Sequence, residues 1–344
     1  MNKTPKIIEK WLILGAILVI LMIVIGGITR LTQSGLSIVH WKPISGIIPP
    51  LNEKDWQIEF EHYQSSPEFQ LKNAHYNLDD FKKIFFWEYL HRFMGRLTGI
   101  VFIIPFLYFS FTRKIKDHRL FRNLLIILLL GSLQGYAGWY MVKSGLVDNP
   151  HVSHYRLAIH LGLALLLLSF IVWELLKFRI PIINYDYPKH KKIRQLLGLT
   201  VVLISTQIIF GAFMSGLKAG YAYPTFPKMG KEWIPQSILN SFKDIGFISL
   251  VENPISVQFI HRWLGASALL FIFLVYLRSK KEVISSKQLR SIKMVLHTTT
   301  LQFVLGVTTL LFSVPIILGI LHQLVAVMLL MTLVVSYYLF KYKT

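Results

Sequence analysis

Four of the twelve histidines lie inside long apolar stretches at positions that match between the two halves of the sequence: His91, His160, His261 and His322. Polar groups in such stretches are costly to bury and are usually functional. Cysteine is absent, which excludes disulfides, thiolate metal ligands and cysteine nucleophiles. Because imidazole nitrogens bind metals and heme iron, these four histidines are the main candidate ligands.

The four histidines share one depth in their segments. Each stands four to seven positions after the expected start of its segment, at residue 84, 156, 256 or 316. At about 1.5 Å of rise per residue, all four lie roughly 6–10 Å below one end of their helices. They can therefore pair laterally, His91 with His160 and His261 with His322. Two imidazoles that face each other across a helix bundle form a bis-histidine heme site, so the spacing predicts two heme sites.

Other interpretations are open at this point. The histidines could each hydrogen-bond to a neighbouring helix without binding a ligand, although four matched positions make that less economical. Zinc would need three or four protein ligands at each site. A di-iron carboxylate site needs two Glu-x-x-His pairs on helices. Only Glu88 and His91 form such a pair in an apolar segment, since Glu59 and His62 lie in a loop.

The two halves differ by one carboxylate. Glu88 lies three residues before His91 and therefore on the same helix face. The matching position before His261 is Gln258. A carboxylate beside only one of two similar sites favours chemistry at that site and electron transfer at the other. The alternative is that Glu88 pairs with Arg92 or reaches the outer interface.

An arginine follows one histidine of each pair. Arg92 comes directly after His91, and Arg262 comes directly after His261. The planar guanidinium binds carboxylates bidentately, so both residues are candidates for contacts with heme propionates. The alternative is that both side chains extend to the membrane interface.

The composition determines the class of fold that positions these residues. The chain has 344 residues, of which 53% are hydrophobic and 16% charged, and its mean hydropathy is +0.51. These values exclude a soluble globule, a disordered chain and a fibrous repeat. We therefore expect an all-α polytopic membrane protein with eight transmembrane helices. The eight apolar segments are residues 11–30, 84–111, 123–143, 156–178, 195–217, 256–278, 293–313 and 316–340.

An internal repeat divides the eight segments into two halves. Residues 90–95 (LHRFMG) are echoed by residues 260–265 (IHRWLG). Further echoes pair Gly35 with Gly220, Pro43 with Pro227, Gly46 with Gly230, Gln134 with Gln302 and His160 with His322. Because the repeat unit is four helices, the halves should share one orientation, related by a pseudo-two-fold axis along the membrane normal. We expect two four-helix bundles, residues 11–178 and 195–340.

The net charge of +20 indicates membrane topology rather than nucleic-acid binding, because the basic residues gather in short loops. The long loop 31–83 holds five lysines against seven acidic residues. The positive-inside rule therefore places both termini in the cytoplasm and the long loops outside. The five expected inner segments, which carry 22 of the 37 Lys and Arg residues, are residues 1–10, 113–122, 177–194, 278–293 and 341–344.

Several motifs, in order along the chain, resemble one enzyme family. They are residues 26–37 (GGITRLTQSGLS) with 41–43 (WKP), residues 88–96 with the pattern Glu-x-x-His-Arg-x-x-Gly-Arg, residues 155–162 (YRLAIHLG), and residues 258–262 with the pattern Gln-x-x-His-Arg. Together they resemble the heme A synthase family over about residues 11–340. Some bacterial members carry a cysteine pair in the outer loops. This chain has none and resembles the branch shared with the mitochondrial proteins.

The resemblance implies an enzyme that oxidises the C8 methyl group of heme O to the formyl group of heme A, through an alcohol, for cytochrome oxidase biogenesis. By this resemblance His91 and His160 frame the substrate heme, whereas His261 and His322 ligate a permanent heme b. Glu88 is then the expected catalytic residue. Arg92 and Arg262 are the expected cofactor contacts. The implied partners are heme O, a heme O synthase, membrane lipid and an electron acceptor, with no nucleic acid, in a bacterial inner membrane.

Three rival classes fit less well. A di-heme b-type electron carrier linked to quinol would need neither the Glu88/Gln258 asymmetry nor the long loop 31–83. A transporter would place its site near the midplane with broken helices, whereas these histidines cluster toward one face. A prenyltransferase would need aspartate-rich motifs, and no apolar segment contains Asp. The electron carrier is the runner-up, distinguished by holding two b hemes and making no heme A.

Overall fold

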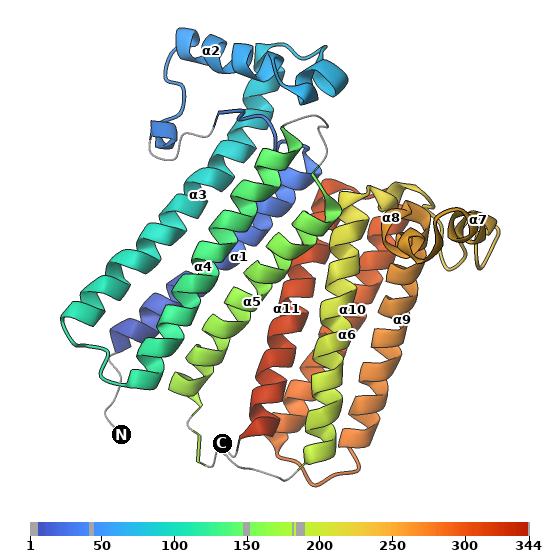
Figure 1. Cartoon of the computed structure of the whole chain (residues 1–344). Coiled ribbons are helices and arrows are strands. Elements are labelled where there is room, and N and C mark those ends of the chain that lie inside the picture. Colours follow the sequence, from blue (N-terminus) through green and yellow to red (C-terminus); the bar gives the residue numbers. More distant parts are fainter. Residues whose placement is uncertain (1–5, 41–44, 147–151, 181, 184–189, 343–344) are drawn as a thin grey trace. The chain divides into compact units, whose positions relative to one another are not determined.

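A computed structural model of the chain describes residues 6–40, 45–146, 152–180, 182–183 and 190–342 (Figure 1). The prediction of an all-α polytopic membrane protein is confirmed, and the described residues contain no strand. Within the described residues, eight helices are long and apolar enough to cross a membrane. They are α1 (Lys6–Leu31), α3 (Leu78–Phe111), α4 (His118–Gly145), α5 (His154–Arg179), α6 (Lys191–Gly216), α9 (Pro254–Ser279), α10 (Ser286–Leu311) and α11 (Ile316–Lys341).

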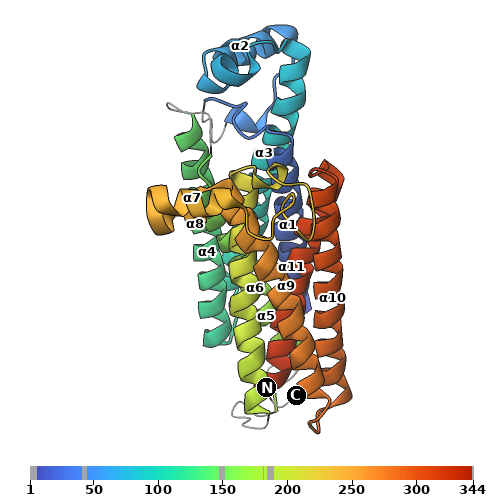
Figure 2. The same ribbon diagram turned by 90° about the vertical axis from the view of Figure 1, so that its right-hand side faces the viewer.

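The chain divides into two compact units, residues 1–167 and 168–344, and the boundary falls inside α5. Short helices lie in the long connections of each unit (Figure 2). The first loop, residues 32–77, contains α2 (Glu53–Gln64), and the second loop, residues 217–253, contains α7 (Gln236–Ile245) and α8 (Ser249–Glu252). The expected bundles over residues 11–178 and 195–340 stay a prediction.

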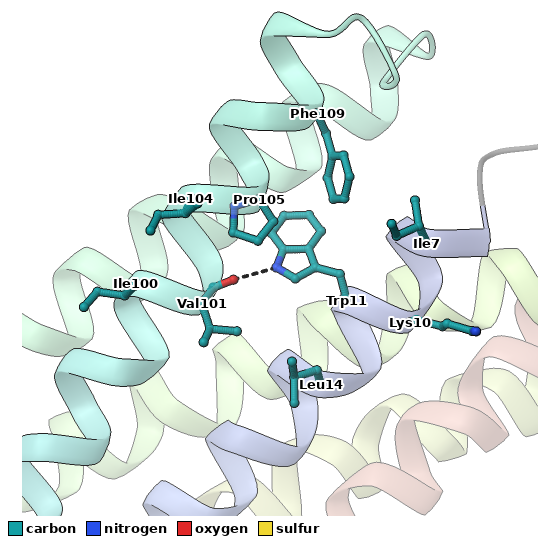
Figure 3. A pocket seen from close by; sticks show the side chains of 9 residues that line it. All are labelled: Ile7, Lys10, Trp11, Leu14, Ile100, Val101, Ile104, Pro105 and Phe109. Carbon is teal, nitrogen blue, oxygen red and sulfur yellow. Dashed lines mark hydrogen bonds between the residues drawn. The ribbon is translucent and has the colours of Figure 1, made fainter.

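In the first unit, α1 packs along α3 at the position of a proline. Pro105 has no N–H, so it cannot donate the helical hydrogen bond to the carbonyl of Val101, four residues earlier. The indole Nε1 of Trp11 donates to that carbonyl oxygen instead, at 2.9 Å (Figure 3). Helix α3 continues past Pro105 to Phe111, because this contact supplies the missing donor in a setting without water.

The start of α3 is earlier than the sequence pattern indicated. The expected start at Ile84 is wrong, because the helix begins at Leu78, where the Asn77 side chain accepts from the backbone N–H groups of Asp79 and Asp80. The two extra turns are stabilised by an aromatic cluster with α2 rather than by lipid. This cluster comprises Trp56, Phe60, Tyr63, Phe81 and Phe85. His91 therefore lies deeper along its own helix than the spacing argument assumed.

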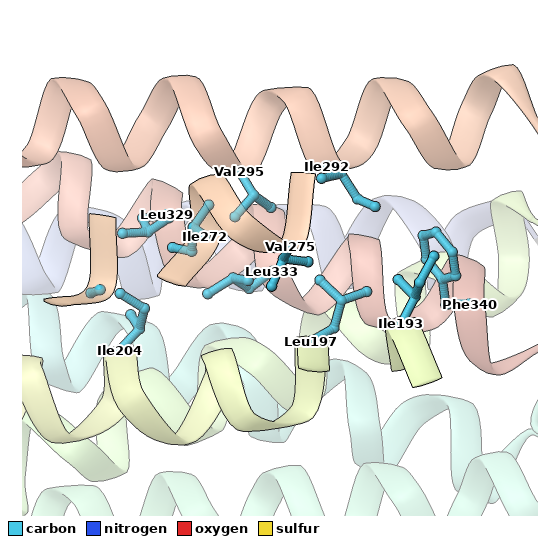
Figure 4. Packing of buried hydrophobic residues seen from close by; sticks show 11 residues of the cluster. Ile193, Leu197, Ile204, Ile272, Val275, Ile292, Val295, Leu329, Leu333 and Phe340 are labelled. Carbon is cyan, nitrogen blue, oxygen red and sulfur yellow. The ribbon is translucent and has the colours of Figure 1, made fainter. Parts of the chain in front are cut away.

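In the second unit, α6, α9, α10 and α11 enclose one apolar core (Figure 4). Branched aliphatic side chains from all four helices meet there, with a single aromatic ring near one end. The core residues are Ile193, Leu197, Ile204, Ala268, Ile272, Val275, Ile292, Val295, Leu329, Leu333 and Phe340. Close packing of this kind holds neighbouring helices at fixed register, which is what two facing ligands need.

Candidate functional site

The four candidate ligands come together in two pairs, one in each unit. In the first unit, His91 of α3 and His160 of α5 lie close enough to interact electrostatically. In the second unit, His261 of α9 and His322 of α11 do the same. This placement is compatible with the lateral pairing expected from the spacing, and the binding of a heme between the two rings of each pair stays a prediction.

Each histidine ring packs against a glycine on a neighbouring helix. A methyl group placed on Gly138 or Gly306 would lie 2.8 or 2.9 Å from Cε1 of His160 or His322. The same addition at Gly26 would lie 3.2 Å from Nε2 of His91, and at Gly211 it would lie 3.3 Å from Cε1 of His261. Contacts below about 3.4 Å force a neighbour to shift, so these glycines provide the space in which the four imidazoles sit.

Three of the four histidines also contact a glutamine one turn before that glycine. The amide nitrogens of Gln134, Gln207 and Gln302 lie 3.4, 3.4 and 3.3 Å from Nε2 of His160, His261 and His322. Gln207 donates in addition to the backbone oxygen of His261, at 3.0 Å. In all three cases the ring Nδ1 and the amide oxygen are buried without a hydrogen-bond partner.

His91 has a methionine in the place of that glutamine. Met22 lies four residues before Gly26, as each glutamine lies four residues before its glycine. A methyl group on Gly95 would lie 3.5 Å from Cε of Met22, and the corresponding position on Gly265 lies 3.2 Å from the amide nitrogen of Gln207. Met22 and Gln207 therefore reach equivalent places in the two units.

Glu88 is buried beside the first histidine pair and holds the first loop against α3. Its side chain, in a residue 2% exposed, forms an ion pair with Arg92 at 2.6 Å. Its other oxygen accepts from Ser37 Oγ at 2.7 Å and from the backbone N–H of Ile38 at 2.9 Å. Arg92 also donates to the Ile38 carbonyl at 3.0 Å. Both partners of the ion pair thus bind the same short stretch of loop.

The second unit contains the neutral counterpart of this contact. Arg262 donates to the carbonyl of Tyr223 at 2.6 Å, and the Gln258 amide nitrogen donates to the same oxygen at 3.3 Å. Arg262 reaches the Lys228 carbonyl as well, at 3.3 Å. Gln258 is fully buried. The second loop is therefore held on α9 as the first loop is held on α3, but without an ion pair.

A pocket of about 400 Å³ lies between the first loop and α3. Arg92 and Arg96 face it from α3, and apolar residues of the loop form much of the opposite wall. Guanidinium groups beside apolar surface suit a ligand with a carboxylate and an apolar body. The lining residues, which include two carboxylates, are Ile38, His40, Gly46, Ile48, Pro49, Pro50, Leu51, Asp55, Ile58, Glu59, Phe85, Tyr89, Arg92 and Arg96.

Comparison with known proteins identifies the family. The family described as cytochrome oxidase assembly protein matches residues 9–334. A protein named heme A synthase from Wolbachia pipientis wMel is 43% identical over 324 residues, 92% of this chain and 88% of that protein. The heme A synthase of Flavobacterium psychrophilum is 41% identical, covering 96% of this chain and 97% of that protein. The chain belongs to the heme A synthase family.

The paired histidines fit a heme better than a metal held by protein alone. Among the described residues no group of three or more His, Cys, Asp or Glu could hold a metal ion. A porphyrin supplies four ligands itself and needs only axial imidazoles. The unpartnered ring nitrogens of His160, His261 and His322 are buried donors or acceptors that a metal bond would satisfy. In a member of the heme A synthase family, this donor set fits heme iron.

Sequence reasoning singled out the histidines but missed most of their supports. It matched Gln134 with Gln302, and it overlooked Gln207, Met22 and the four glycines. The signal that finds them is Gln-x-x-x-Gly in the helix beside each histidine, with Met-x-x-x-Gly in α1. The Trp-Lys-Pro motif at residues 41–43, which contributed to the family resemblance, lies outside the described residues.

Proposed function

We propose that this chain is a heme A synthase that oxidises the C8 methyl group of heme O to a formyl group, through an alcohol. Membership of the family, over nearly the whole chain, carries this proposal. The histidine pair in each unit supports the proposed function, because two similar histidine sites suit one substrate heme and one resident heme. A di-heme electron carrier is not favoured, since the matching relatives are named heme A synthase.

We propose that His91 and His160 hold the substrate heme and that His261 and His322 hold a heme b. Heme b, when bound, supplies a redox centre that relays electrons toward an external acceptor. The protein residues supply the geometry: helices α9 and α11 fix two imidazoles, and the core of the second unit keeps those helices in register. Arg92 and Arg262 lie directly after a ligand in each unit and are the proposed contacts for heme carboxylates.

We propose that Glu88 acts on the substrate in the first unit. It lies one turn from His91, and its two oxygens are fixed by Arg92, Ser37 and Ile38. Each two-electron oxidation of the methyl carbon releases protons and develops positive charge. A fixed carboxylate can stabilise that charge and take up a proton. The ion pair with Arg92 keeps this carboxylate oriented in an apolar setting.

The wider setting of the enzyme is also a proposal. We infer two repeat-related four-helix bundles over residues 11–178 and 195–340, in a bacterial inner membrane with both termini cytoplasmic. This topology rests on the asymmetry of Lys and Arg between the loops. A heme O synthase is the proposed source of the substrate, because the proposed substrate is heme O.

The deciding experiment is expression of the chain with a heme O synthase in a host that lacks heme A. Extracted hemes are separated by chromatography. Heme A should appear with the wild-type chain and be absent with His91→Ala, expressed to the same level. A wild-type protein that holds two b hemes and yields no heme A would establish the electron carrier instead.

A further inference from the structure

The second loop contains a short helix with several exposed apolar side chains. Leu239, Phe242 and Ile245 of α7 are 49%, 40% and 51% exposed, and Phe247 and Ile248, just beyond the helix, are 79% and 53% exposed. Outside the membrane-spanning segments, grouped apolar side chains that stay exposed mark a site of interaction. We propose that these five residues, the apolar face of α7, bind the lipid at the boundary of the membrane.

The apolar face runs along one side of α7, because its helical members are three residues apart. Asn240 and Asp244, which are four residues apart, lie on the opposite side of the helix. The ring of Phe242 stands edge-on to the ring of Phe247, with the ring centroids 5.1 Å apart, so the apolar face extends beyond the last residue of the helix. This division into two sides is typical of a helix that lies between a polar and an apolar phase.

A hydrogen bond sets the level of α7 relative to the membrane. Asn253, whose side chain caps the start of α9, donates from its amide nitrogen to Oγ of Ser241 at 2.6 Å. Helix α9 has 26 residues, which gives it a length of about 39 Å at about 1.5 Å per residue. The hydrocarbon core of a bilayer is about 30 Å thick, so a helix of this length reaches the headgroup layers at its ends. The contact with Asn253 therefore places α7 at the level where interfacial helices bind.

The direction of α7 also fits an interfacial helix. Figure 2 shows α7 lying across the spanning helices of its unit rather than along them. A helix with this direction is parallel to the membrane surface, so its whole length can lie at one depth. Ile238, one turn before Phe242 on the same side, is buried. The beginning of the helix is therefore packed, and the apolar face continues beyond the packed part.

Apolar contact, rather than charge, is the basis of this binding. Residues 236–252 contain one lysine, Lys243, against two acidic residues, Asp244 and Glu252. This balance does not favour attraction to anionic headgroups. Tyr221 and Trp233 of the same loop are exposed as well, which is typical of the aromatic belt at a membrane surface. A layer of zwitterionic lipid is therefore a sufficient partner for the apolar face of α7.

The test uses the absence of cysteine from the chain, because a single introduced cysteine takes a single nitroxide label. Leu239→Cys and Phe247→Cys place the label on the apolar face, and Asn240→Cys and Asp244→Cys, on the opposite side of α7, are the matched controls. Each full-length chain is reconstituted as one copy per nanodisc of phosphatidylcholine. Power-saturation electron paramagnetic resonance then measures collisions of the label with oxygen, which concentrates in lipid, and with a water-soluble nickel chelate. The ratio of oxygen to nickel collisions should be several-fold higher at positions 239 and 247 than at positions 240 and 244.

Equal collision ratios on the two sides of α7 would mean that both sides face water, and would overturn the proposal. Immobilised labels at positions 239 and 247 that neither reagent reaches would place protein rather than lipid on the apolar face, with the same consequence. Adding phosphatidylglycerol should leave the ratios unchanged, and a lipid contact that formed only with this anionic lipid would contradict the apolar basis of the binding. Circular dichroism and the elution volume of each variant check its fold, and two positions on each side allow the comparison if one variant fails to fold. The measurement does not depend on heme, so it is independent of the proposed function.

Discussion

Glu88 on α3 and Gln258 on α9 occupy matching positions, and each holds a long loop on its helix, Glu88 through a carboxylate and Gln258 through an amide. Each residue, with an arginine four positions later, fixes a long loop at backbone groups close to its helix. Only in the first unit do both residues carry a charge and form an ion pair. Burying an ion pair is expensive, and the neutral Gln258 shows that an amide suffices to hold a loop. The charge of Glu88 therefore needs a reason beyond the loop, and the role that we propose for it at the substrate site would provide one.

The proposed difference between the two units would be wrong if their two histidine pairs were interchangeable. We expect His261→Ala to lose the tightly held b heme, because it removes one of two axial ligands. His91→Ala should retain that heme and yield no heme A. Absorption spectra of the purified variants, with extracted hemes quantified, check both. A His261→Ala protein with a full six-coordinate low-spin b spectrum would contradict the assignment of sites.

The charge of Glu88 is tested by replacing it with glutamine, the residue at the matching position, 258, of the second unit. Glu88→Gln should bind heme at both sites but make about 10²- to 10⁴-fold less heme A, the usual range for a lost acid–base group. Heme O or its alcohol should accumulate, as measured by chromatography of extracted hemes. The reverse change, Gln258→Glu, is the control and should leave heme A production within a few-fold of wild type. Wild-type output from Glu88→Gln would assign Glu88 to the loop alone.

Two glycine contacts allow the two histidines of the second unit to be compared with each other. A methyl group at Gly306 would lie 2.9 Å from His322, whereas at Gly211 it would lie 3.3 Å from His261. We expect Gly306→Ala to cost about 1–3 kcal/mol of heme b binding through overpacking. Gly211→Ala should cost less. Heme b occupancy during titration with a scavenging apoprotein gives both values, and equal losses would mean that the ring spacing does not control the site.

The smallest expected effect concerns the hydroxyl that holds the first loop. Ser37→Ala removes one of the two loop donors to Glu88, while the Ile38 N–H remains. We expect opening of the first loop to become easier by about 1 kcal/mol, or roughly fivefold. Hydrogen exchange of residues 34–38 in detergent reports this opening. Ser65→Ala, which removes an exposed bond to the His62 carbonyl, is the control and should leave exchange of residues 34–38 unchanged.

The elements that the sequence predicted well are those whose signal lies within one segment. All eight spanning helices follow from apolar length alone, and the histidine pairs follow from matched positions in those helices. The predicted start of α3 was wrong because the first turns of this helix are stabilised by Phe60 and Tyr63 of α2. A contact between separate segments leaves no periodic pattern in the sequence.

The supports of the site were predicted poorly for the same physical reason. Gln207 and His261 are 54 residues apart, and Ser37 and Glu88 are 51 residues apart. Such contacts depend on which helix faces lie together, and a single sequence does not record that. The Glu88–Arg92 ion pair, which the sequence offered as the alternative role for Glu88, is present in the structure, because residues four apart on a helix share a face.

The hydrogen bond from Trp11 to Val101 has a consequence for how the chain assembles during synthesis. The first span enters the bilayer before the second, and the carbonyl of Val101 lacks a donor until Trp11 reaches it, because Pro105 provides none. An unpaired carbonyl in lipid costs several kcal/mol. The second span is therefore less stable in the bilayer alone than beside the first. Pro105 and Trp11 together therefore favour the pairing of α3 with α1 while the remaining spans are still being made.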